Sequence, residues 1–108
     1  MAKRKIPVKS FLTNEEFQSF IESEKDWLFS HIIRAIEKAF FENLEAAEIM
    51  EAKISETMNK ITMRSERHEW ITSLTLALKW YESGERYEKC AKILNLINSI
   101  KEFQNSQN

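Results

Sequence analysis

The chain has 108 residues, of which 43% are hydrophobic and 31% charged, and its formal net charge is −1 at pH 7. These values exclude a disordered chain and suit one soluble domain with a modest core. It has one Gly and one Pro, whereas average proteins contain roughly 7% and 5%. Because so little turn chemistry is available, we expect few loops, long helices and an all-α fold packed as a helical bundle or coiled coil.

A single cysteine excludes a disulfide framework and a Cys-based metal site within one chain. The start, MAKRKIPVKSFLT, is basic but lacks the apolar region of a secretory signal. No run approaches the ~18 to 20 apolar residues of a membrane span. We therefore expect a cytoplasmic protein that does not bind membranes. The many Ile, Lys, Asn and Glu residues suggest an AT-rich genome, such as that of a phage or of a low-GC bacterium.

The net charge hides an uneven distribution. Residues 1–11 carry four Lys or Arg and no acid, whereas residues 12–60 carry eleven acids and five bases. Residues 61–108 carry seven bases and six acids. The acidic middle disfavours binding of nucleic acid along the whole chain.

Residues 1–12 are predicted to form a basic extended arm, because Pro7 lacks an amide donor and keeps Ile6 out of helical space. A single helical domain is then expected over 13–103, followed by a frayed tail at 104–108.

The sequence FLTNEEF marks the first helix start. Thr13 and Glu16 have the spacing of a capping box, and Leu12 and Phe17 have that of a hydrophobic staple. Ser23 with Asp26 could then cap a second helix. We leave open whether the chain kinks at Ser23 or continues as one helix.

A long central helix is predicted over about 24–62. Apolar residues recur there with an average step near 3.6, and neither Gly nor Pro interrupts them. The positions are Trp27, Phe29, Ile33, Ile36, Phe40, Leu44, Ala47, Met50, Ile54, Met58 and Ile61. Such a helix would be roughly 58 Å long at 1.5 Å per residue.

A C-terminal αα-hairpin is predicted over about 66–82 and 86–103. Ser65 provides a fresh helix start, and Gly84 occupies the position where a helix end favours a left-handed residue. We expect the hairpin core to contain Trp70, Leu74, Leu78, Tyr87, Ala91, Leu94 and Ile97, with Cys90 beside them as a packed small side chain.

Residues 77–100 resemble the UVR-type helical hairpin of nucleotide-excision-repair proteins and Clp-associated adaptors. The matching positions are Tyr87, Glu88, Cys90, Ala91 and Ile97. Leu94 and Asn95 stand where that motif has an Arg-Asp pair. The resemblance implies a protein-docking module that often self-associates and has no catalytic residues.

Catalytic and metal-binding patterns are absent from the sequence. His31 and His68 are the only histidines, and no triad-like spacing connects them. HEWIT begins like the zinc motif H-E-x-x-H, but Thr72 replaces the second histidine. We predict a protein that is not an enzyme and has no metal and no cofactor.

The predicted long helix is too long for the hairpin arms to cover. An apolar stripe would remain exposed, and a second copy could cover it in a homodimer or higher oligomer. The predicted partner or oligomer face is Ile33, Ile36, Phe40, Leu44, Met50, Ile54, Met58 and Ile61. The alternative is a monomer in which a sharp break near Ser23 or Asn43 folds the chain back.

The leading functional hypothesis is a small adaptor or regulator that binds another protein. Two alternatives remain: a nucleic-acid-associated protein, or a protein that binds a small anionic ligand such as a nucleotide at a subunit interface. The candidate contacts for either anion are Lys3, Arg4, Lys5, Arg64, Arg67, Arg86, Lys89 and Lys92.

Overall fold

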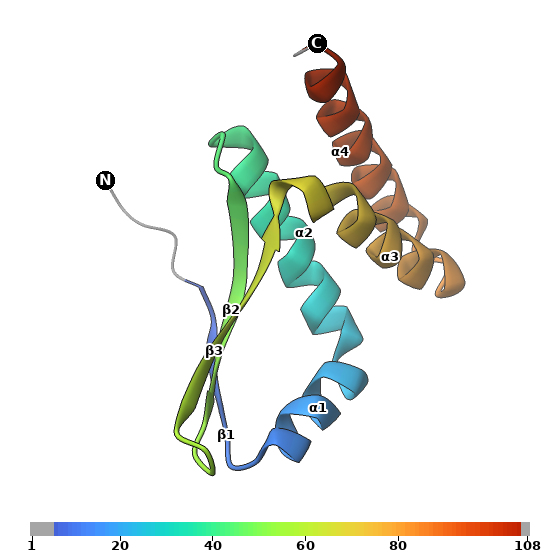
Figure 1. Ribbon diagram of the computed structural model, residues 1–108. Coiled ribbons are helices and arrows are strands. Elements are labelled where there is room, and N and C mark those ends of the chain that lie inside the picture. The colour runs from blue at the N-terminus through green and yellow to red at the C-terminus, as the bar shows by residue number, and fades with distance from the viewer. Residues whose placement is uncertain (1–5, 107–108) are drawn as a thin grey trace.

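The computed structural model describes residues 6–106 and shows a mixed α/β fold (Figure 1). Helix accounts for 63% and strand for 21% of it, so the predictions of an all-α fold and of a helical bundle are wrong. The elements in chain order are β1 (Val8–Phe11), α1 (Asn14–Ser23), α2 (Lys25–Phe41), β2 (Ala46–Ile54), β3 (Asn59–Glu66), a 3₁₀ turn (Arg67–Glu69), α3 (Trp70–Ser83) and α4 (Tyr87–Ser106).

The sheet has the order β1-β2-β3, with β1 parallel and β3 antiparallel to the central strand β2. Val8 pairs with Glu51, and Phe11 pairs with Ile54. Two parallel neighbours need a crossover connection, which α1 and α2 provide. The part of the arm that the structure describes therefore belongs to the sheet.

The start of α1 agrees with the predicted capping box. The Thr13 hydroxyl accepts a hydrogen bond from the Glu16 amide at 3.1 Å, and the Glu16 carboxylate accepts one from the Leu12 amide at 2.7 Å. The predicted staple differs, because Leu12 is 66% exposed. Phe17 instead packs against Phe11, with ring centroids 5.3 Å apart.

The long helix predicted over 24–62 is not formed, and the chain breaks at two places. Glu24 has non-helical angles (φ −112°, ψ 48°) and separates α1 from α2. After α2, Asn43 has φ 56°, and the Leu44 amide donates back to the Ala39 carbonyl at 2.8 Å. This left-handed cap ends the helix. The first break directly follows Ser23 and the second is at Asn43, which are the two positions where the sequence allowed a sharp break instead of a continuous helix.

Residues 46–66 form a β-hairpin where the helix was expected. Met50, Ala52 and Ile54 are buried, while Glu51 and Lys53 lie on the other face of the sheet. This alternation is that of a strand. A register shift between Glu48 and Met50 then allows Ile49 to be buried as well. In the turn, the Met58 amide donates to the Ser55 carbonyl, and Met58 has φ 55°.

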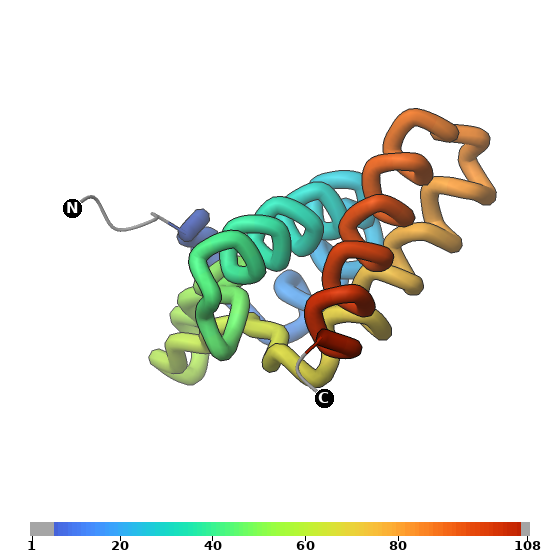
Figure 2. The backbone as a smooth tube through the Cα atoms, turned by 90° about the horizontal axis from the view of Figure 1, so that it is seen from above, coloured from blue at the N-terminus to red at the C-terminus, as the bar shows by residue number. Residues whose placement is uncertain are grey.

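Helix α2 is the middle layer of the molecule, between the sheet and the α3–α4 hairpin (Figure 2). Toward the sheet, Ala35 and Ala39 of α2 and Ala47 and Ala52 of β2 are each at most 2% exposed. Side chains this small let a helix approach a strand closely, and the larger Met50 and Ile54 fill the space on either side of Ala52 in β2.

The predicted αα-hairpin is present, and α3 and α4 lie side by side (Figure 2). Its start is later than expected because Ser65 is still part of β3. Trp70 begins α3, and its indole Nε1 donates to the Ser65 carbonyl at 2.9 Å. The buried tryptophan thus fixes the corner between the sheet and the hairpin.

The predicted hairpin core is right for the residues of α3 and partly wrong for those of α4. Trp70, Leu74 and Ile97 are buried and Leu78 is partly buried, as expected. Tyr87, Ala91 and Leu94 are exposed instead. The buried residues of α4 are Cys90, Ile93, Leu96, Ile97 and Ile100. The reason is tertiary: α4 also packs beside α2, which turns its buried face away from the hairpin axis.

Gly84 does not take the left-handed conformation predicted for it, since its φ is −94°. Glu85 takes that conformation with φ 55°. The Glu85 amide donates to the Glu82 carbonyl and the Arg86 amide to the Tyr81 carbonyl, at 3.0 and 2.9 Å. This is a Schellman cap placed one residue after the glycine.

The predicted partner or oligomer face is not one surface. Ile33, Ile36, Met50 and Ile54 are buried in the core, and Met58 is 91% exposed at the tip of the β-hairpin. Phe40 is partly buried, while Leu44 and Ile61 are exposed on different elements. The argument for self-association from helix length therefore loses its basis.

Candidate functional site

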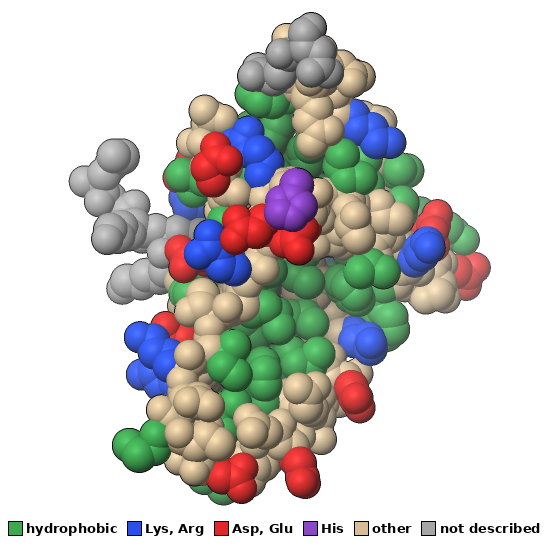
Figure 3. Space-filling model, in the orientation of Figure 1, with side chains coloured by type: hydrophobic (Ala, Val, Ile, Leu, Met, Phe, Trp, Pro, Cys, Tyr) green, Lys and Arg blue, Asp and Glu red, His purple; other side chains and the backbone are tan. Residues whose placement is uncertain are grey.

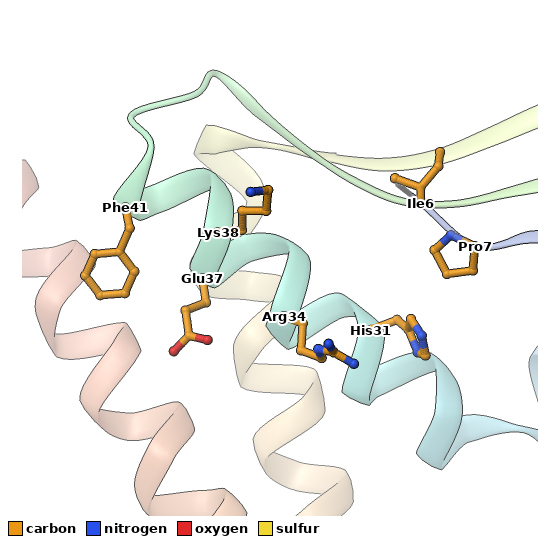
Figure 4. A pocket seen from close by; sticks show the side chains of 7 residues that line it. All are labelled: Ile6, Pro7, His31, Arg34, Glu37, Lys38 and Phe41. Atoms are coloured by element: carbon orange, nitrogen blue, oxygen red, sulfur yellow. The ribbon is translucent and has the colours of Figure 1, made fainter. Parts of the chain in front are cut away.

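A cleft of about 720 Å³ lies between α2 and the segment that leads into β1 (Figure 4). Its lining residues are Ile6, Pro7, His31, Arg34, Glu37, Lys38 and Phe41. Figure 4 shows the α2 side chains along one side of the helix, with Ile6 and Pro7 across the cleft from them. The lining combines basic, imidazole and apolar groups.

The helical period places three of these groups in a row. His31, Arg34 and Lys38 are three and four residues apart, so they project from the same side of α2. The His31 Nδ1 lies 2.8 Å from the Trp27 carbonyl oxygen, and the two rings stack with centroids 4.0 Å apart. A carbonyl only accepts, so the Nδ1 is the donor in this contact, and the Nε2 is the ring nitrogen that it leaves for another partner. Lys38 forms an ion pair with Glu42.

A second, smaller cavity of about 240 Å³ lies between α2 and α4. Its lining residues are Ser30, Ile33, Arg34, Lys89, Lys92 and Ile93. Arg34 lines both cavities. None of its described lining residues is a carboxylate, so three cations and one hydroxyl face a single space.

The three cations differ in their partners. Within residues 6–106, Arg34 makes no hydrogen bond or ion pair. The Lys92 ammonium lies 3.8 Å from a Glu37 carboxylate oxygen, which is a long ion pair. The Lys89 ammonium lies 5.1 Å from the centroid of the Tyr81 ring. Arg34 is therefore the cation with the greatest capacity for an external anion.

A polar cluster beside the smaller cavity joins α2 to the hairpin. Trp80 Nε1 donates to Asp26 at 2.9 Å, and Arg86 Nη1 lies 3.3 Å from the other Asp26 oxygen. The Trp80 hydrogen bond and the Arg86 charge hold the pKa of Asp26 below its usual value. Next to it, burial, followed by the Asp26 charge, raises the pKa of Tyr81. The buried Tyr81 hydroxyl has no hydrogen-bond partner among the described residues.

The eight predicted anion contacts do not form one patch. Lys89 and Lys92 line the smaller cavity, whereas Arg86 is paired with Asp26. Arg64 pairs with Glu66 on β3, and Arg67 donates to the Leu44 carbonyl at 2.7 Å and to Asn43 at 3.0 Å. Lys3, Arg4 and Lys5 lie outside the described residues.

Arg34 was missed by the sequence analysis. On α2 it occupies an exposed position, which has no distinguishing local signal. Its neighbours Lys89 and Lys92 are more than fifty residues further along the chain, and only the packing of α4 on α2 brings them to the same cavity.

A second surface follows β3, which is an edge strand. Ile61 and Met63 lie on the face that α2 covers elsewhere, and Lys60, Thr62 and Arg64 lie on the opposite face. Ile61 is 38% exposed, because α2 packs mainly on β2. Hydrophobic side chains gather in the middle of this side of the molecule, beside the strands (Figure 3).

In the described part of the chain, no three His, Cys, Asp or Glu side chains are placed to hold a metal ion. Cys90 is buried and His68 is exposed in the 3₁₀ turn. No helix within residues 6–106 has the length and apolar character needed to cross a membrane.

No family model, curated protein or solved structure matches the chain. The likeness of residues 77–100 to the UVR-type hairpin stays a resemblance.

Proposed function

We propose that this chain is a small, non-catalytic adaptor or regulator that binds another protein, and that β3 is the element through which it docks. The observation that carries the proposal is the free edge of β3. This eight-residue strand pairs with β2 on one side, and no other described strand pairs with its second edge. Free N–H and C=O groups on such an edge can pair with an added strand.

The two faces of β3 indicate what kind of strand would fit. Ile61 and Met63 alternate with Lys60 and Arg64, so one face of an added strand would meet apolar groups and the other would meet these two cations. Lys60 pairs with Glu51 at 3.5 Å and Arg64 with Glu66 at 3.2 Å, and an acidic partner would compete with these exposed ion pairs. Lys60 and Arg64 side chains are 64% and 51% exposed. An extended segment with alternating apolar and acidic residues is therefore the complementary partner.

A second copy of the same strand is less complementary. An antiparallel two-fold pair centred on Thr62 would place Lys60 opposite Arg64 of the other copy, and like charges directly opposite destabilise a sheet. The same alternation that favours an acidic partner therefore disfavours a homodimer through β3. Self-association through another surface stays a prediction.

The proposal can be tested with a synthetic peptide of alternating Val and Glu, and with a Val and Lys peptide as its control. We expect the acidic peptide to bind and to slow hydrogen exchange in β3 specifically. The Lys60→Glu, Arg64→Glu double variant should weaken binding about tenfold, which corresponds to about 1.4 kcal/mol. Lys79→Glu on α3 should leave it unchanged.

Three outcomes would contradict the proposal: no protection of β3 at saturating peptide, equal binding of the basic peptide, or equal binding by the double variant. Light scattering on the same samples separates partner binding from self-association, because a monomer has a mass of 12.9 kDa.

A further inference from the structure

We propose that the smaller cavity between α2 and α4 binds a phosphoryl group of a small organic phosphate, through Arg34, Lys89 and Lys92. This site is separate from β3 and does not depend on the docking function proposed above. The observation behind it is the convergence of three cations from two helices on one cavity of about 240 Å³, which has no carboxylate among its described lining residues.

The chemistry of the lining suits a phosphoryl group. The Arg34 guanidinium can donate two parallel hydrogen bonds to phosphate oxygens, while the lysines act as point charges. The Ser30 hydroxyl adds a neutral donor. Ile33 and Ile93, which are 6% and 0% exposed, form apolar walls. Apolar walls lower the local dielectric and strengthen each charge–charge contact.

The partners of the three cations leave them available. Arg34 makes no ion pair or hydrogen bond within the described residues. Lys92 is 3.8 Å from Glu37, whereas a charge-assisted hydrogen bond to a phosphate would be about 2.7–2.9 Å. Lys89 is partly buried against the Tyr81 ring, which limits its freedom before a ligand arrives. A bound phosphate would therefore give Arg34 new hydrogen bonds and would give Lys92 a shorter ionic contact than the one it makes with Glu37.

The surroundings favour a compact ligand over a nucleic-acid polymer. Carboxylates of Asp26, Glu37 and Glu88 lie on the same two helices as the three cations, so the positive region is short. A polymer with one charge per nucleotide needs a longer basic track. The cleft of about 720 Å³ that shares Arg34 offers space for the rest of the ligand, against Pro7, His31 and Phe41.

The test is calorimetric titration with ATP and with inorganic tripolyphosphate, which has the phosphate groups but no organic part. We expect both to bind, and Arg34→Gln to weaken both at least tenfold. Arg34→Lys should recover part of the loss, because it keeps the charge and loses the bidentate geometry. Lys53→Gln, an exposed lysine on the far face of the sheet, is the matched control and should bind as the unmodified protein does.

The two histidines report where the organic part lies. The His31 proton resonances should shift on addition of ATP but much less with tripolyphosphate, while those of His68, in the 3₁₀ turn, should not move with either. Arg34 is exposed and has no partner among residues 6–106, so its substitution should leave the unfolding midpoint unchanged, and a loss of binding can then be assigned to the site.

Each alternative result overturns the proposal. Equal affinity of Arg34→Gln and the unmodified protein would remove Arg34 from the site. Tripolyphosphate that binds no more tightly than sulfate would mean non-specific ion attraction. Nucleic acid would be the ligand of this surface if a single-stranded oligonucleotide bound more tightly than ATP. The logarithm of its binding constant would then also fall with the logarithm of the salt concentration, by more than about 0.7 for each of three phosphates.

Discussion

Helix α2 packs against its two neighbours in different ways. Toward β2 the buried side chains include small ones: Ala35 and Ala52 are 2% and 1% exposed, and Ala52 lies between the larger Met50 and Ile54 on its face of the strand. Toward the hairpin the contact uses large rings and polar groups: Phe29 and Trp80 are 6.1 Å apart, and Asp26 accepts from Trp80. An atom added at a buried alanine of the first interface must displace its neighbours, whereas the second interface depends on the volume of its large side chains.

The difference separates two kinds of sensitivity. A close-packed helix–sheet contact is disturbed mainly by added volume, and a contact built on large side chains is disturbed mainly by lost volume. Both can be measured by urea unfolding of single variants against a matched control on the same element or of the same residue type.

The largest effect is expected from Leu74→Ala in the hairpin. Leu74 is fully buried, so truncation should lower the free energy of unfolding by about 2–5 kcal/mol through lost burial and the cavity left behind. Leu76→Ala on the same helix is the control, because Leu76 is 56% exposed. Similar losses for the two variants would mean that the face of α3 is assigned incorrectly.

Ala52→Leu tests the helix–sheet side. Added volume at this buried position of β2 should cost about 1–3 kcal/mol, because neighbouring side chains must leave their preferred rotamers. Ala91→Leu on the exposed face of α4 should change stability by no more than about 0.5 kcal/mol. A large loss for Ala91→Leu would instead support the inner face predicted from the sequence.

The turn between α3 and α4 allows a smaller and opposite effect. Gly84 has an ordinary φ, and an added Cβ would meet its nearest atom at 3.6 Å, which is normal contact. Gly84→Ala should therefore stabilise the protein by about 0.4–1 kcal/mol by restricting the unfolded chain. If Gly84 were left-handed, the same variant would be destabilised. Glu85→Ala is the comparison at the neighbouring residue. It should not raise the free energy of unfolding, because alanine at this position would have to adopt the same positive φ.

The pH dependence of the polar link is the finest test. The pKa of Asp26 is lowered in the folded protein, by the Trp80 hydrogen bond first and by Arg86. Its contribution to stability is therefore complete above the pKa of an unfolded Asp and is lost as pH falls through the lowered folded value. We expect the stability difference between the unmodified protein and Asp26→Asn to shrink over that acidic range. If the stability difference did not vary with pH, the ionised Asp26 carboxylate would not stabilise the contact between α2 and the hairpin.

Local signals in the sequence identified several elements correctly. Thr13 and Glu16 start α1 as their spacing predicts, and Trp70 and Leu74 form part of the hairpin core. These features depend on residues within one turn or one helix of each other. The sequence also indicated Lys89 and Lys92 as anion contacts, but it did not indicate the cavity between α2 and α4 that they line.

The β2–β3 hairpin was missed because its pattern fits two periods. Met50, Ile54 and Met58 are four residues apart, a step close to one helical turn and also an even number, as a strand requires. Ala52 distinguishes the two, since it is buried with Met50 and Ile54 in the strand. An alanine gives a weak hydrophobic signal and a strong helix preference, so its role was not visible.

What the sequence contains in local form is the Thr13–Glu16 cap of α1, the α3–α4 hairpin and the stock of residues available for chemistry. The choice of strand over helix for 46–66, the rotation of α4 and the convergence of Arg34 with Lys89 and Lys92 depend on the whole fold. The physical reason is that each of these is decided by contacts between segments distant in the chain. Burial of Ala52 in the core outweighs the helix preference of its own segment.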